Sequence, residues 1–112
     1  MKIINAKEAP GGPNPHNVKA SQVYDNEHAM VVHMTLEPGQ SLKRHITPVD
    51  VFFYVLEGTG VVEVGDEKQT VGPDSLIDSP ARIPHCWYNE SDKPLRVLVV
   101  KVPRPTTQTR LL

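Results

Sequence analysis

Short apolar runs alternate with turns rich in glycine and proline along the whole chain, and this alternation limits the possible folds more than any other feature. Together with two more polar segments of strand length, 41–47 and 68–71, the runs occupy residues 30–36, 51–56, 61–64, 76–78, 87–89 and 95–102. Each is about the length of one β-strand, and no segment keeps a helical period over about eleven residues. Eleven prolines, roughly twice the usual share of about 5%, fall mostly between the runs. The pattern therefore predicts an all-β sandwich or barrel.

The length of 112 residues fits one domain and leaves no room for a second core. We expect a single domain over 1–112, with a core barrel at about 28–103, an N-terminal strand and turn-rich arm at 1–27 and a tail at 104–112. Residues 1–8 are expected to form the first strand, and the last eight residues to be frayed.

Charge and composition argue against several classes of partner. The formal net charge is -1, and the only adjacent basic pair is Lys43 and Arg44. Binding to the phosphate backbone of nucleic acid needs a basic face, so we expect no nucleic-acid partner. No apolar run approaches the roughly eighteen residues of a membrane span. Cys86 is the single cysteine and can form no internal disulfide, which suits the reducing interior of the cytoplasm.

Two spaced motifs carry the chemistry of the chain. In the first, Gly39 is followed by five residues and His45, and side-chain alternation points Thr47 the same way as His45. The second motif consists of Pro80, His85 and Asn89 at their positions in the sequence. Two histidines on separate strands converge only if the sheet closes on itself. This layout over residues 39–89 resembles the cupin superfamily, as a small single-domain cupin, and the resemblance implies a double-stranded β-helix, or jelly-roll barrel.

The resemblance also implies where a metal would bind. Cupins that hold a divalent ion generally use three histidines and a glutamate, and this chain keeps the first and last positions as His45 and His85. Thr47 stands where the second histidine belongs, and Val51 stands at the glutamate position. His45 and His85 are therefore the candidate ligands for Zn, Fe, Ni or Mn. Asp50 and His33 are additional candidates, against the alternatives that Asp50 caps a turn and that His33 is a half-buried sheet residue.

The same alternation predicts the residues around a pocket. The candidates are Thr47, Val51, Phe53, Arg82, Trp87 and Tyr88. Arg82 replaces a motif glycine at a tight corner, where it either binds an anionic group or is an exposed turn residue. Trp87 either lines the pocket or fills the core. His16 and His28 lie in irregular polar stretches and are expected to be solvated, and Cys86 is expected to act as a small hydrophobe.

Three functions remain open on the sequence. The first is a metal-dependent enzyme with dioxygenase-like or isomerase-like chemistry on a small molecule, and the second is a metal-free module that binds or senses a small organic ligand. The third is acid–base catalysis by histidine without metal. Large side chains at Phe52, Tyr54 and Leu56 would face outwards on their strand. They need cover, so we expect a homodimer.

Overall fold

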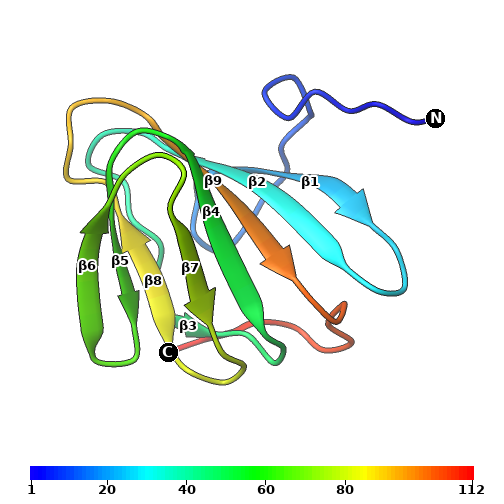
Figure 1. The fold of residues 1–112 in the computed structure, drawn as a ribbon. Coiled ribbons are helices and arrows are strands. Elements are labelled where there is room, and N and C mark those ends of the chain that lie inside the picture. Colours follow the sequence, from blue (N-terminus) through cyan, green and yellow to red (C-terminus); the bar gives the residue numbers. More distant parts are fainter.

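A computed structural model describes residues 1–112 and shows ten strands in two five-stranded antiparallel sheets (Figure 1). The strands are β1 (Lys19–Asp25), β2 (Met30–Leu36), β3 (His45–Ile46), β4 (Val51–Glu57), β5 (Gly60–Val64), β6 (Glu67–Val71), β7 (Leu76–Ser79), β8 (His85–Tyr88), β9 (Leu95–Lys101) and β10 (Arg110–Leu111). One sheet has the order β1-β2-β9-β4-β7 and the other the order β10-β3-β8-β5-β6. The prediction of an all-β fold is confirmed. No helix is present that could cross a membrane.

Strand alternation builds the core between the two sheets. On β4, Val51, Phe53 and Val55 are at most 2% exposed, whereas the residues between them are only half-buried. β9 lies between β2 and β4 and directs Leu95 and Val97 into the same core. Burial of this apolar surface is the main stabilising contribution to the fold.

The interior is tightly filled at the end where β4 turns into β5. Gly60 at the start of β5 packs so closely that an added Cβ would lie 2.9 Å from Cζ3 of Trp87. Gly58 precedes it with a φ of +86°, which favours glycine because it has no Cβ. Trp87 is fully buried there, edge-on to Phe53 at a ring-centroid distance of 5.5 Å.

The two ends of the chain differ from the expectation. Residues 1–8 form no strand; the backbone makes a turn instead, in which the carbonyl of Asn5 accepts hydrogen bonds from the amides of Glu8 and Ala9. The first strand is β1, whose sequence shows no clear period. It forms a strand because β2 pairs with it and supplies its hydrogen bonds. The expected fraying of the tail was also wrong at its end, since β10 pairs with β3.

The expected strand at 41–47 is much shorter in the structure. Only His45 and Ile46 form β3, and Ser41 makes an isolated bridge to Tyr88. Between them, the amide of Leu42 still donates to the carbonyl of Trp87, whereas the amide of Lys43 donates to His16 of the N-terminal arm.

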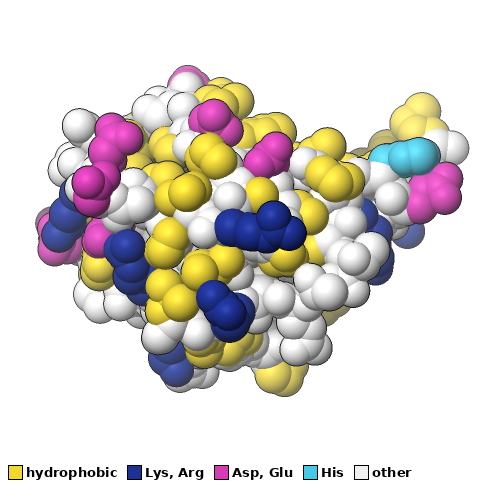
Figure 2. Space-filling view, turned by 90° about the horizontal axis from the view of Figure 1, so that it is seen from below, with side chains coloured by type: hydrophobic (Ala, Val, Ile, Leu, Met, Phe, Trp, Pro, Cys, Tyr) yellow, Lys and Arg dark blue, Asp and Glu magenta, His cyan; other side chains and the backbone are white.

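Figure 2 shows the face seen from below the view of Figure 1. Hydrophobic side chains are spread over it and mixed with Lys and Arg near its centre, while Asp and Glu lie mainly in the upper half of the view. Hydrophobic and basic side chains are therefore interleaved near the centre of this face.

Candidate functional site

His45 and His85 come together where the short strand β3 pairs with β8. The two residues are opposite each other in the register, and their ring centroids are 4.4 Å apart. Both side chains are buried, with 7% and 2% of their surface exposed. The second sheet therefore holds two imidazoles in contact at one end of the barrel.

Hydroxyl groups engage both nitrogens of His85. Its Nδ1 lies 2.6 Å from Oγ of Ser79 at the end of β7, and its Nε2 lies 3.2 Å from Oγ1 of Thr47. Burial lowers the pKa of His85 to about 3, and the neighbouring His45, Lys101 and His16 act in the same direction. His85 is thus a neutral ring at pH 7, held in place by its two hydroxyl partners.

A third imidazole comes from the N-terminal arm. His16 lies with its ring centroid 4.6 Å from that of His45, although the two residues are far apart in the sequence. Burial, reinforced by His45, Lys43 and Lys101, lowers its pKa to about 4. The expectation that His16 is solvated was wrong, because the irregular arm folds back against the barrel. No periodic pattern in residues 9–17 indicated this contact.

The backbone of Lys43 fixes the proton positions on two of the three rings. Its N–H donates to Nδ1 of His16 at 3.0 Å, so the proton of neutral His16 is on Nε2. Its carbonyl can only accept, and it lies 2.6 Å from Nδ1 of His45, which must therefore carry the proton. Burial lowers the pKa of His45 below its usual range. Neutral His45 consequently offers a lone pair on Nε2, and neutral His16 offers an Nε2–H donor.

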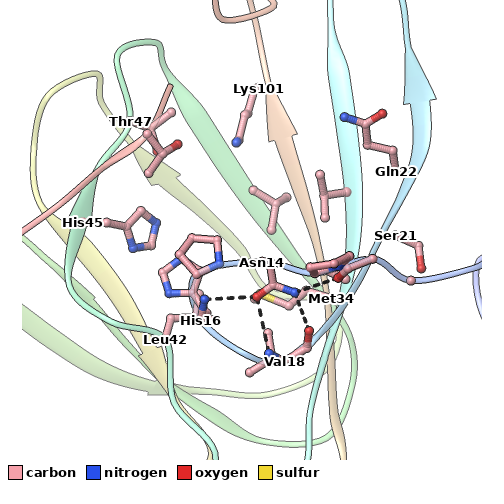
Figure 3. A pocket seen from close by; sticks show the side chains of 18 of the residues that line it. Asn14, His16, Val18, Ser21, Gln22, Met34, Leu42, His45, Thr47 and Lys101 are labelled. Carbon is pink, nitrogen blue, oxygen red and sulfur yellow. Dashed lines mark hydrogen bonds between the residues drawn. The ribbon is translucent and has the colours of Figure 1, made fainter. Parts of the chain in front are cut away.

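These rings line a cavity of about 530 Å³ between the sheets and the arm (Figure 3). Its apolar wall is built from Val18, Val32, Met34, Leu42, Phe53 and Val99. Figure 3 shows Asn14 within the arm, where its side chain donates to the carbonyl of Val18 at 2.6 Å and accepts from the amide of His16 at 3.1 Å. The side-chain amide thereby holds the arm in a compact loop next to the cavity.

Lys101 adds a cation to the cavity. It is the last residue of β9 and follows Leu95, Val97 and Val99 on the face of the strand that points into the barrel. Burial lowers the pKa of its amino group. In Figure 3 the amino group points into the space between Thr47, His45 and the arm. The sequence analysis did not single out Lys101, although extending the alternation of β9 by one step would have indicated it.

The predicted pocket residues divide into two groups. Thr47 and Phe53 line the cavity together with His45 and His85. Val51 and Trp87 are buried in the core and do not line it. Arg82 is on an exposed turn with a φ of 66°, and Tyr88 donates its hydroxyl hydrogen to Glu63 at 3.0 Å, away from the cavity.

The two additional ligand candidates lie outside the cavity. Oδ1 of Asp50 accepts from the amide of Ala81 at 2.8 Å, which is the turn-capping role considered as the alternative. His33 is only 1% exposed, and its Nε2 accepts from Nε of Arg96 at 3.1 Å. Alternation on β2 directs His33 away from the side on which Val32 and Met34 line the cavity.

The side chains at this end of the barrel do not fit the metal site that the fold family implies. Both nitrogens of His85 have hydroxyl partners, and Nδ1 of His16 accepts from the amide of Lys43, so its Nε2 carries the proton. Of the three rings, only His45 keeps a free lone pair, on Nε2. No carboxylate lines the cavity. No group of three or more His, Cys, Asp or Glu side chains is arranged to hold a metal ion.

Comparison with known proteins identifies relatives of this fold. The sequence profile described as "Cupin domain" matches residues 32–101. The chain is similar to the crystal structure of TT1209 from Thermus thermophilus, with 36% identity over 94% of this chain and 100% of that chain and a TM-score of 0.81. No curated protein matches the sequence.

Two further crystal structures share the fold at lower identity. The polyketide cyclase RemF from Streptomyces resistomycificus has a TM-score of 0.85 and 20% identity, over 100% of this chain and 85% of that chain. An uncharacterized conserved protein with a double-stranded β-helix domain from Klebsiella pneumoniae has a TM-score of 0.84 and 18% identity, over 99% of this chain and 96% of that chain. The predicted double-stranded β-helix is therefore confirmed.

Proposed function

Since the chain belongs to the cupin domain family, and its barrel opens onto a cavity lined by imidazoles, we propose that it binds a small organic molecule there and transfers protons to and from it without a resident metal. The observation that carries the proposal is the hydrogen bonding of Lys43. Its backbone gives His45 and His16 complementary tautomers, with an unprotonated nitrogen on one ring and an N–H on the other. Nε2 of His45 can take a proton from the ligand and return it, while the Nε2–H of His16 can hydrogen-bond to the ligand atom on which negative charge develops.

The shape and polarity of the cavity support a small organic ligand. A volume of about 530 Å³ is within the usual range of small-molecule sites, which are mostly apolar with a few polar groups at fixed positions. Phe53 and Met34 provide apolar surface, and Thr47 and the histidines provide the polar groups. Ser79 and Thr47 keep His85 oriented, so a ligand would meet a preorganised ring.

The competing hypothesis is a weak divalent-metal site on His45 and His85. It requires His85 to give up its hydrogen bond to Thr47, because the metal would need the Nε2 lone pair. It also requires additional ligands from solvent or substrate. The hypothesis of a bound Zn, Fe, Ni or Mn ion stays a prediction that metal analysis can test.

The first experiment measures metal content by mass spectrometry on untagged protein, together with long-range ¹⁵N–¹H spectra of the histidine rings at pH 7. We expect less than stoichiometric metal, with the proton of His45 on Nδ1 and that of His16 on Nε2. The signals of His45 and His16 should be unchanged in a His28→Ala variant, because the His28 side chain is exposed and does not line the cavity. A near-stoichiometric transition metal that disappears in a His45→Ala/His85→Ala variant would overturn the metal-free proposal in favour of the competing one.

We also propose that the chain forms a homodimer through the outer face of β4. Phe52, Tyr54 and Leu56 on this face are only half-buried, and large apolar groups on a sheet surface commonly mark an interface. Light scattering coupled to gel filtration should give twice the mass of 12.5 kDa. A monomer at micromolar concentration would contradict the proposal.

A further inference from the structure

The ionisable groups that line the cavity are all basic. They are His16 from the arm, His45 from β3, His85 from β8 and Lys101 from β9. Burial is the main cause of the lowered pKa of His85 and of His16, and Lys101 acts in the same direction on both. No acidic group lines the cavity to offset the amino group of Lys101. A ligand that complements this amino group carries negative charge.

Lys101 supplies the permanent charge among these groups. The three histidines are neutral at pH 7 because burial lowers their pKa values below the ordinary 6.5. Burial also lowers the pKa of Lys101, but the ordinary value for a lysine, 10.5, is well above that of a histidine. The ammonium group makes no ion pair or side-chain hydrogen bond within the chain, in contrast to Arg44, Arg96 and Arg104, which all have acidic partners. A cation placed on the inward face of a strand without a partner loses hydration.

We propose that Lys101 is the anchor for an organic carboxylate, whose apolar part packs against Phe53, Met34 and Val99. The inference rests on the proposed function and names the ligand class of that site. A single ammonium matches a monoanion, whereas a phosphate dianion would keep an uncompensated charge at the apolar wall. The Nε2–H of His16 and the hydroxyl of Thr47 are further donors at the same cavity. An anion bound to Lys101 would restore the solvation that the ammonium loses on burial.

The experiment compares matched probes that differ in charge. Binding is measured by isothermal titration calorimetry for benzoate and benzamide, for 1-naphthoate and 1-naphthamide, and for phenyl phosphate, on the full chain. We expect each carboxylate to bind roughly tenfold to a hundredfold more tightly than its amide, which is the usual advantage of one charge-assisted hydrogen bond. The preference should disappear in Lys101→Met and persist in Lys101→Arg.

A lysine outside the cavity provides the matched control. Lys68 on β6 is exposed, with its amino group 5.0 Å from the centre of the Tyr88 ring. Lys68→Met removes the same charge and should leave the preference unchanged. If Lys101→Met does not fold, Lys101→Gln and the acid-to-amide ratio of the native protein still decide the matter.

Each outcome separates this inference from the proposed function. Equal binding of acids and amides would keep the small-molecule pocket and overturn the anionic ligand. Tighter binding of phenyl phosphate than of benzoate would overturn the carboxylate class. Binding of none of the probes would overturn the inference, whereas the proposed proton chemistry would still be judged by the histidine spectra and the metal analysis.

Discussion

The two ends of the barrel interior are built by the same strand alternation but are filled in opposite ways. At the end marked by Gly58 and Gly60, Trp87, Leu36 and Leu95 leave no exposed side-chain surface. At the other end, His45, His85 and Lys101 surround a cavity of about 530 Å³. The closed end contributes stability through close packing, whereas the open end places basic groups where they lose hydration. The comparison indicates that close packing is confined to one end of the barrel and that the cavity occupies the other.

The largest effect is expected from emptying the closed end. Trp87→Ala removes a fully buried side chain in contact with Phe53 and should lower the free energy of unfolding by about 3–5 kcal/mol. Urea denaturation followed by circular dichroism measures the loss. Tyr24→Ala, at a residue that is 52% exposed, is the control and should change stability by less than about 0.5 kcal/mol. Similar losses in the two variants would contradict the assignment of this end as the packed core.

Overfilling the closed end should have a smaller effect. Gly60→Ala places a methyl group against Trp87 and Leu95 and should destabilise the protein by about 1–3 kcal/mol. Gly72→Ala is the matched control, because a Cβ there meets no atom within 4 Å and the φ is not positive. Thermal unfolding of the pair checks the prediction, and a Gly60→Ala variant as stable as Gly72→Ala would refute close packing at this point.

At the open end, the hydroxyl partners of His85 can be removed one at a time. Ser79→Ala leaves the buried Nδ1 of His85 without its 2.6 Å partner and should cost about 1–2 kcal/mol. Thr47→Val removes a longer contact of 3.2 Å and should cost less. Denaturation curves rank the two variants. The reverse order would mean that Thr47, rather than Ser79, orients the ring.

Acid should lower the stability of the open end gradually, over several pH units, and not in a single step. The folded-state pKa values of His16 and His85, about 4 and about 3, lie below the unfolded value of 6.5, so the unfolded chain binds more protons in this window. Stability should therefore be full above about pH 6.5 and fall as the pH decreases towards 4 and then 3. Melting temperatures between pH 7 and pH 4 measure this fall. His85→Gln should flatten the curve and His28→Ala should not, and a melting temperature independent of pH would contradict neutral buried rings.

The all-β architecture could be predicted from the sequence, because turn residues and side-chain alternation are local properties. The convergence of His45 and His85 was expected only from the closed barrel that the two motifs imply through their resemblance to the cupin superfamily. The spacing from Gly39 to His45 and from Pro80 to Asn89 also placed two imidazoles on strands that the closed sheet brings together. The placement of Thr47 on the same face as His45 was predicted from side-chain alternation, but the contact of its hydroxyl with Nε2 of His85 was not.

The surroundings of those imidazoles depend on the tertiary structure. His16 reaches His45 because Asn14 keeps the arm compact and the amide of Lys43 donates to His16, and such long-range contacts have no local pattern. The same packing placed Asp50, His33 and Arg82 away from the cavity and exposed Lys101 to it. A strand pattern specifies which face a side chain takes, whereas burial, desolvation and hydrogen-bond partners depend on segments that are distant in the chain.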